Sequence, residues 1–437
     1  MADEQKIVHA KRAEPRNPLV LGLLSLLVGA VAGLVGSVFR LGLRQLDAWR
    51  TLWIERAHVW GWGGALFVIV GVALLAAIAA WMVRTIAPES TGSGIPYVES
   101  QLREGWIGNP FRIIWVKLVG GWMAIGGAGL ALGREGPTVQ IGAVIGYILG
   151  GIFRRSEEER LVLLAAGAGA GLATAFNAPI AGAVFVLEEL VGAFDVPISI
   201  ATLGTSVGAI GVARLLLGHS PDFAVPMLKQ PNLGRVWPHL VLGVVMGLLG
   251  IVYARAILGM IALQKHCSKV PVEFRAATVG AMIGLLGWFA PTLIGGGDIL
   301  TQQALTGSVV YSAMAVIFLI RFVLGPLSYS AETPGGIFAP MLTVGAQGGL
   351  LLAWLWVRVF PSGPFLPQEF AVVGMAGFFT AVVRAPVTGI VLVIELVGSS
   401  SLLLPMLAAA FAAMTVATII GQPPIYESLR VVRSSRN

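Results

Sequence analysis

Residues 113–153 read IIWVKLVGGWMAIGGAGLALGREGPTVQIGAVIGYILGGIF, a long apolar stretch, rich in glycine, that decides the fold class. Glu135 is the only acidic residue between Glu104 and Glu157. A carboxylate at the depth of a bilayer is costly unless it faces protein or a water-filled path, so it is a functional candidate by default. The alternative is a neutralised structural glutamate that pairs with the neighbouring Arg134.

The whole chain has the composition of a polytopic membrane protein. Its 437 residues are 56% hydrophobic and only 12% charged, with a mean hydropathy of +0.85, which excludes a soluble globular domain. Apolar runs recur along the chain, and several are shorter than the roughly 20 residues that cross a bilayer upright. Glycine and proline interrupt many of them. We therefore expect an all-α membrane protein with tilted, broken or re-entrant helices.

The charges predict the topology. Basic residues gather in both terminal tails and in loops such as Arg154–Arg155, so the positive-inside rule places both termini in the cytoplasm. The net charge of +7 then reflects the cytoplasmic placement of basic residues and not nucleic-acid binding.

The first apolar run is too long for a signal-peptide core. The single cysteine, Cys267, excludes an intramolecular disulfide and a multi-cysteine metal site. We expect no metal, cofactor or nucleotide site.

Two passages recur about two hundred residues apart, with offsets of 203 and 207 residues. The matched positions are Gly133, Pro137, Gly142 and Gly146 with Gly336, Pro340, Gly345 and Gly349, and Ala178-Pro179, Gly182 and Glu188 with Ala385-Pro386, Gly389 and Glu395. Paired interrupted segments in the two halves of a transporter indicate its binding site. We divide the chain into a first membrane repeat (18–217) and a second (218–430), between basic tails 1–17 and 431–437, with no soluble regulatory domain. The pattern leaves open whether the repeats are parallel or inverted.

Three segments place glycines before a proline where a helix can begin, at residues 92–96, 133–137 and 335–340. Helix N-termini expose unpaired N–H groups and a partial positive charge. Several that converge would hold an anion without a full positive charge, so the anion could also leave. Ser93 and Tyr426 could add hydroxyl donors. Taken alone, Ser93 is more typical of a helix cap and Tyr426 of an interfacial aromatic.

These segments, in this order and followed by a late tyrosine, resemble the CLC chloride channel and transporter family, specifically its bacterial proton/chloride exchangers. The resemblance covers residues 18 to 430. It implies an all-helical homodimer of multi-pass subunits in the bacterial inner (plasma) membrane. Each subunit would hold its own pathway between two inverted-topology repeats, with chloride, protons and the lipid bilayer as its partners.

The resemblance also implies roles for individual residues. Ser93 and Tyr426 would hold the central chloride together with the backbone N–H groups of Ile337 and Phe338. Glu135 matches the gating glutamate, whose carboxylate competes with chloride for the outer anion site. Protonation would release that carboxylate, so chloride binding and proton uptake become one competitive event. The remaining anion-binding positions within the matched segments are Gly94, Ile95, Arg134, Gly136 and Ala339.

Three further residues follow from the same comparison. Glu189 matches the inner proton-transfer glutamate, and Glu188 is a second candidate for this role. Since the repeat pairs Glu188 with Glu395, Glu189 is the additional acid. Lys117 lies close to where the family has a buried lysine, which would raise the local potential for anions. The alternative for Lys117 is snorkelling to the membrane interface.

Two acids depart from the family pattern. Glu332 lies just before the third glycine segment, where relatives have a small residue, and it could oppose anions or accept protons. A solvent-facing loop position is favoured, because loops run over protein surfaces. Asp298, in Gly295-Gly296-Gly297-Asp298, is a milder departure without an interpretation.

The nearest alternative function is a passive voltage- or proton-gated chloride channel of the same fold. Glu135 and Glu189 together favour the exchanger. Ser93 and Tyr426 favour chloride over fluoride, and Ser93 favours chloride over nitrate, since nitrate-preferring relatives have proline there. Residues 204–208, GTSVG, fit a hydrolase nucleophile pattern, but that pattern needs a strand-to-helix turn and a histidine base.

Overall fold

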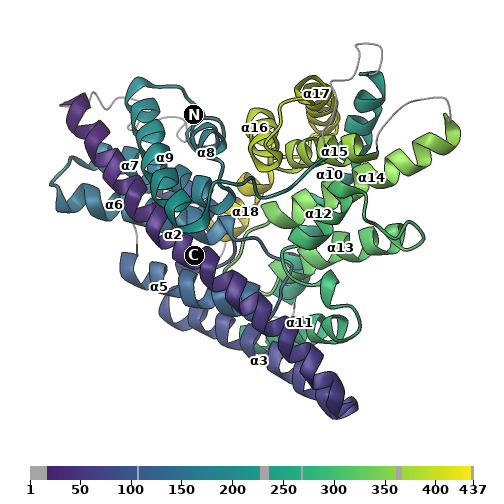
Figure 1. The fold of residues 1–437 in the computed structure, drawn as a ribbon. Helices are drawn as coiled ribbons and strands as arrows, with labels where there is room; N and C mark the ends of the chain where they lie inside the picture. The colour runs from purple at the N-terminus through teal and green to yellow at the C-terminus, as the bar shows by residue number, and fades with distance from the viewer. Residues whose placement is uncertain (1–16, 106–107, 227–235, 267–268, 361–366, 435–437) are drawn as a thin grey trace.

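The computed structural model describes residues 17–105, 108–226, 236–266, 269–360 and 367–434. Within these ranges the chain is helical, and only two isolated backbone bridges connect extended segments (Figure 1). The all-α prediction is therefore confirmed. Most of the expected N-terminal tail and Cys267 lie outside the described residues.

Two helical halves are separated by the connection after residue 217. The first half contains α2 (Pro18–Ala57), α3 (Trp62–Ile86), α4 (Ile95–Glu104), α5 (Pro110–Gly121), α6 (Glu135–Ile152), α7 (Glu157–Phe176), α8 (Pro179–Phe185) and α9 (Val196–Leu217). The second contains α10 (Trp237–His266), α11 (Val272–Phe289), α12 (Asp298–Thr306), α13 (Met314–Tyr329), α14 (Phe338–Val359), α15 (Pro367–Val383), α16 (Pro386–Val397), α17 (Leu403–Ile419) and α18 (Ile425–Ser434). The last helix thus extends four residues beyond the expected boundary at 430.

Helix lengths match the expectation of tilted and broken spans. Among the described residues, seven helices are long and apolar enough to cross a membrane, and α13, α15, α16 and α17 are apolar but shorter. With 40 residues, α2 is about 60 Å long, roughly twice the thickness of the hydrocarbon core, so it must tilt strongly or extend beyond it. Figure 1 shows it crossing the molecule diagonally. Helix α7 is almost wholly buried and forms the interior of its half.

The repeated glycines allow helices to pack closely in both halves. A Cβ atom on Gly142 of α6 would overlap the backbone of Gly167 on α7, and one on Gly345 of α14 would overlap that of Gly374 on α15. Contacts of this kind need small residues because they bring two helix backbones together. The glycine repeat in the sequence therefore corresponds to two equivalent helix pairs, α6 with α7 and α14 with α15.

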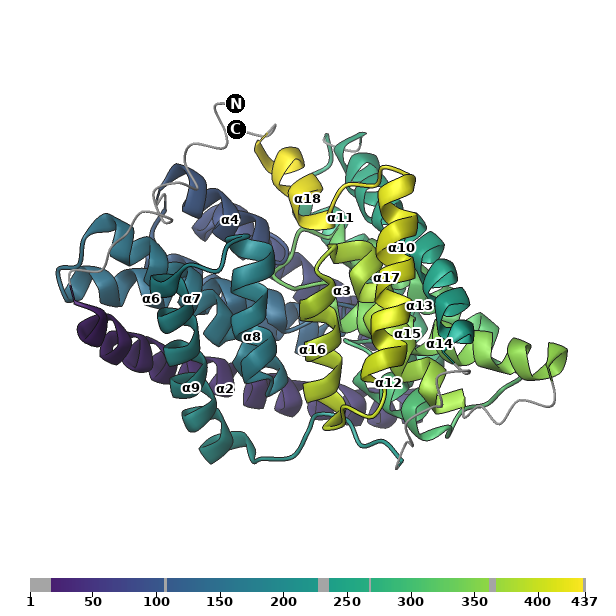
Figure 2. The same ribbon diagram turned by 90° about the horizontal axis from the view of Figure 1, so that it is seen from above.

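The matched acids exchange partners between the halves. Glu188 accepts hydrogen bonds from the N–H groups of Val387 (3.0 Å) and Thr388 (2.7 Å) at the start of α16. Glu395 accepts them from Ile180 (3.1 Å) and Ala181 (2.8 Å) at the start of α8. Each carboxylate thus satisfies the N-terminal donors of a helix in the other half. Such an exchange requires α8 and α16 to lie antiparallel, and Figure 2 shows them side by side.

Candidate anion site

The three glycine segments converge, as predicted. Gly133 and Gly336, the first residues of the matched motifs, exchange two backbone hydrogen bonds of 2.8 and 2.7 Å. The N–H of Gly92 donates a hydrogen bond to the carbonyl of Thr333 (3.2 Å), and the carbonyl of Gly92 accepts one from the N–H of Gly335 (3.0 Å). The backbones approach so closely that a Cβ atom on Gly136 would lie 2.6 Å from the carbonyl oxygen of Ser93. The N-termini of α4, α6 and α14 therefore share one small region.

Glu135 is fully buried at the first position of α6. Its Oε1 accepts a hydrogen bond of 2.7 Å from the N–H of Phe338, which begins α14. Gly133 and Gly336 leave room for this carboxylate, since a Cβ atom at either position would collide with it. Its Oε2 has no hydrogen-bond partner in the part of the chain that the structure describes. The carboxylate therefore binds a helix N-terminus in the way that an anion would.

The contacts of the Arg134 guanidinium are with groups other than the Glu135 carboxylate. Its Nε donates to the carbonyl of Ala175 (2.8 Å), and its Nη2 and Nη1 contact Asp222 (2.6 Å) and Asp298 (3.1 Å). The alternative in which Arg134 neutralises Glu135 as an ion-pair partner is thus wrong. The side chain belongs to a separate charge network beside the gate, and its role in anion binding stays a prediction.

Tyr426 and Ser93 both lie in the buried region. Tyr426, near the start of α18, is completely buried, so the interfacial-aromatic alternative is wrong. Its hydroxyl has no hydrogen-bond partner among the described residues, and its ring centroid lies 5.8 Å from that of Phe338. The Ser93 hydroxyl oxygen accepts a hydrogen bond from the N–H of Ile95 (3.1 Å), which leaves the hydroxyl proton free to donate elsewhere. A buried hydroxyl without a partner requires an explanation, and a bound ion provides one.

The other matched anion-binding positions line the same region. Gly94 caps α4 in the left-handed conformation (φ 83°), and a Cβ atom there would collide with Gln140. Ile95, Ile337 and Ala339 are buried at the starts of α4 and α14. Lys117 is fully buried, and its Nζ donates to the carbonyl of Gly92 (2.7 Å). Lys117 therefore does not snorkel to the interface.

The neighbouring acids Glu188 and Glu189 have different surroundings. Both lie in a π-helical turn, Val186–Leu190, that continues α8. Glu188 is held by α16 and also accepts from the hydroxyl of Thr388 (2.7 Å), whereas Glu189 interacts electrostatically with the nearby carboxylates of Glu99 and Glu427. Sequence reasoning missed Glu99, although it lies on the helix that begins just after Ser93. Unlike Glu188, Glu189 caps no helix among the described residues, and its proton role stays a prediction.

Glu332 differs from its expected solvent-facing position. Its side chain is 19% exposed and lies 3.8 Å from Arg275 on α11. Its backbone is left-handed, with φ of 58°, which is uncommon for a residue other than glycine. The acid therefore connects the α13–α14 loop to α11 by an ion pair.

The hydrolase pattern lacks its required context. Ser206 is buried inside the continuous helix α9, and not at a strand-to-helix turn. Within the described ranges, no group of histidine, cysteine and acidic side chains could hold a metal ion.

Comparison with known proteins agrees with this geometry. The sequence profile of the family described as "Voltage gated chloride channel" matches residues 75–418. A Vibrio parahaemolyticus protein named H(+)/Cl(-) exchange transporter ClcA is 36% identical over 423 residues, which cover 94% of this chain and 89% of the relative. A Salmonella arizonae protein of the same name is 34% identical over 444 residues, covering 98% and 93%.

Two solved structures show the same fold. One is described as a slow cyanobacterial Cl-/H+ antiporter, with a TM-score of 0.90 at 30% identity over 95% of this chain and 98% of the other. The second is described as a CLC-type fluoride/proton antiporter, with a TM-score of 0.75 at 25% identity over 93% and 97%. The chain therefore belongs to the voltage-gated chloride channel family.

Proposed function

We propose that the protein is a secondary active antiporter that exchanges chloride for protons. The observation that carries this proposal is the Glu135 carboxylate, which occupies the N-terminus of α14 through the Phe338 N–H. A chloride ion would use the same donor, so the two anions compete. Protonation of Glu135 removes the charge that holds it there and lets chloride bind.

An exchanger also needs a route for protons, and we place this route on the inner side of the pathway. Tyr426 and Ser93 are both buried, and the Tyr426 ring packs against that of Phe338. Their hydroxyl groups would bind the central chloride. Glu189 would pass protons from the inner solution toward Glu135 along a route separate from chloride. A passive channel needs only the anion route, so the presence of both acids favours exchange.

The deciding experiment uses purified protein in liposomes, with chloride efflux and proton uptake recorded together. An outward chloride gradient should drive protons inward against their own gradient. Glu135→Gln should abolish this proton movement while chloride still crosses, because a carboxamide neither carries the proton nor competes as an anion. Chloride flux without proton movement in the unaltered protein would identify a channel.

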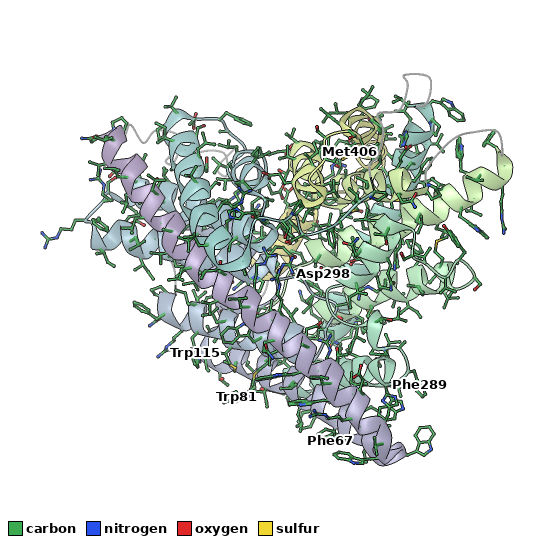
Figure 3. The ribbon with its side chains drawn as sticks, viewed as in Figure 1. Phe67, Trp81, Trp115, Phe289, Asp298 and Met406 are labelled. Atoms are coloured by element: carbon green, nitrogen blue, oxygen red, sulfur yellow. The ribbon has the colours of Figure 1, made fainter. Side chains whose placement is uncertain are left out.

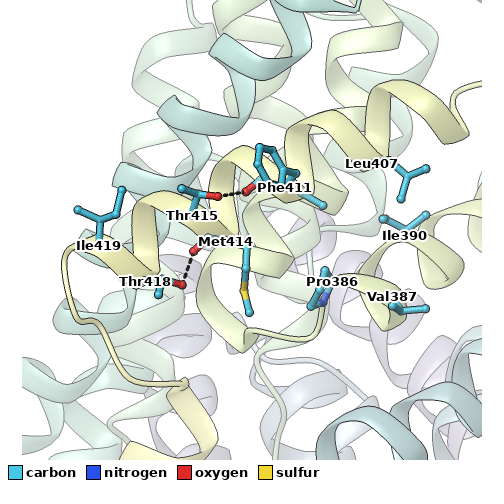
Figure 4. Close-up of a pocket in the computed structure, with 10 residues that line it drawn as sticks. Pro386, Val387, Ile390, Leu407, Phe411, Met414, Thr415, Thr418 and Ile419 are labelled. Atoms are coloured by element: carbon cyan, nitrogen blue, oxygen red, sulfur yellow. Dashed lines mark hydrogen bonds between the residues drawn. The ribbon is translucent and has the colours of Figure 1, made fainter.

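We further propose that the protein is a homodimer in a bacterial inner membrane. Helices α16 and α17 surround an apolar hollow of about 500 Å³, lined by Val387, Ile390, Leu407, Phe411 and others (Figure 4). Thr415 and Thr418 return their hydroxyls to their own helix, so this face offers little polarity. A second copy would fill the hollow. Light scattering of the detergent-solubilised protein should give the mass of two chains, and the mass of one would contradict the proposal.

The orientation follows from the positive-inside rule, with both termini in the cytoplasm. Helix α2, Pro18–Ala57, would then begin at the inner face and end at the outer face. Phe67 and Trp81 on α3 and Phe289 on α11 are exposed (Figure 3), and they would face the lipid in this orientation. Labelling of a cysteine placed in the N-terminal tail by an impermeant reagent, in intact and lysed cells, tests this orientation.

A further inference from the structure

An ion-pair network lies beside the proposed gate. Arg134 contacts both Asp222 and Asp298, and Asp222 also contacts Arg40 at 2.7 Å. Two arginines thus face two aspartates, and their formal charges cancel. Figure 3 places Asp298 near the middle of the molecule, between its two halves. Neither aspartate belongs to the three glycine segments.

Asp222 is held rigidly. It lies in the connection between the two halves, its side chain is 9% exposed, and each of its oxygens contacts a different arginine. Arg40 is itself buried on α2 and donates to the carbonyl of Thr174 (2.8 Å). The next residue, Phe223, donates its N–H to Leu396 on α16 (3.0 Å). The position of the Asp222 carboxylate is therefore set by both halves of the chain.

Asp298 has a fixed backbone and a releasable side chain. Arg321 is buried and donates to the carbonyls of Leu293, Gly295 and Gly296, which fixes the loop before α12. The side chain of Asp298 is 52% exposed, and its hydrogen bond among the described residues is to Arg134. Exposed ion pairs are weak because water and salt screen them. An anion that arrives from solution can therefore displace this carboxylate.

Arg134 is the residue that the two aspartates control. It immediately precedes Glu135 and caps α6. Its Nε and Nη2 are held by the buried partners Ala175 and Asp222, whereas its Nη1 faces the exposed Asp298. A guanidinium edge binds carboxylates and other anions with the same donors.

We propose that Asp298 sets the affinity of the outer entrance for chloride by competing with the incoming anion for Nη1 of Arg134. Asp222 is the positioning residue, which holds the guanidinium where this competition takes place. The inference rests on the proposed chloride exchange. It adds a determinant of outer affinity that lies in none of the matched motifs.

The test measures initial exchange rates in liposomes against external chloride. Asp298→Asn keeps the shape of the side chain and removes its charge. The external KM should fall by up to about fivefold, since the ion pair that the incoming anion must displace is exposed and weak. Turnover at saturating chloride and the internal KM should stay unchanged. The shift should shrink as impermeant salt is added, because salt screens exposed charges.

Asp47→Asn is the matched control. Asp47 is similarly exposed (47%) and pairs with Arg50 on α2, beside the same glycine loop. The Asp47→Asn substitution removes an equal charge nearby, but Asp47 does not contact Arg134. The external KM should therefore change far less than in Asp298→Asn. Equal shifts in both variants, or no shift in Asp298→Asn, would overturn the proposed competition.

Asp222→Asn separates positioning from competition. Because the guanidinium loses its fixed partner, both the external KM and the turnover should change. A normal turnover and KM in this variant would refute the positioning role. If the unaltered protein exchanged no chloride at all, the proposed function itself would fail, which is a different result from normal exchange without an effect of Asp298→Asn.

Discussion

Removing the Tyr426 hydroxyl should weaken chloride binding without weakening the fold. The hydroxyl is buried and has no hydrogen-bond partner within the described ranges, so Tyr426→Phe removes no hydrogen bond found there. A hydrogen bond to a charged group contributes about 1.5–3 kcal/mol. Since about 1.4 kcal/mol is tenfold in affinity, Kd should rise between about 10- and 150-fold.

Isothermal titration calorimetry of the purified protein with chloride measures this change. Tyr253→Phe is the matched control, because Tyr253 is also fully buried with an unpartnered hydroxyl, but it packs between Phe322 and Phe378 instead of against the anion site. That variant should bind chloride normally. An unchanged Kd in Tyr426→Phe, or an equal rise in both variants, would show that the anion does not contact Tyr426.

The remaining predictions concern the inner acid, the glycine repeat and the charge network. Glu189→Gln should stop proton movement in liposomes and leave chloride affinity intact. Glu188→Gln should mainly lower the unfolding temperature, because Glu188 caps α16. The opposite pattern would assign the proton role to Glu188. Gly142→Ala should destabilise the protein by about 1–3 kcal/mol through overpacking, while Gly259→Ala, which meets open space, should be neutral or slightly stabilising in the same thermal melts. Burial disfavours the charged form of Asp222, but the two arginines outweigh it and hold its pKa below the usual range. The stability that Asp222 contributes is therefore complete above about pH 4, its pKa in the unfolded chain, and is lost as the pH falls through its lower pKa in the folded protein. Thermal melts of Asp222→Asn should lack this pH-dependent stability. A pH profile equal to that of the unaltered protein would contradict the prediction.

Much of the fold follows from local properties of the chain. Composition, run length and the positions of Gly and Pro predict broken membrane helices, because a bilayer admits few other backbone arrangements. The matched glycines predict two equivalent halves, and the structure places them where helix backbones touch in each half. The three glycine–proline segments predict helix N-termini, since proline favours the first helical position. Their convergence was inferred from the chemistry of anion binding.

The pairing of side chains could not be predicted in this way. Glu135 meets Phe338, and Glu188 meets the start of α16, across about two hundred residues of sequence. Arg134 adjoins Glu135 in the chain, yet it pairs with Asp222 and Asp298 instead.

Composition and motifs are thus enough to predict the fold class and the repeat, and they propose the residues that carry the chemistry. The folded structure was needed to show that Glu188 and not Glu189 caps α16, that Lys117 is buried, and that Glu332 pairs with Arg275. Membrane partitioning and helix capping depend on neighbours along the chain. Ion pairs and long-range hydrogen bonds depend instead on which helix ends the fold brings together.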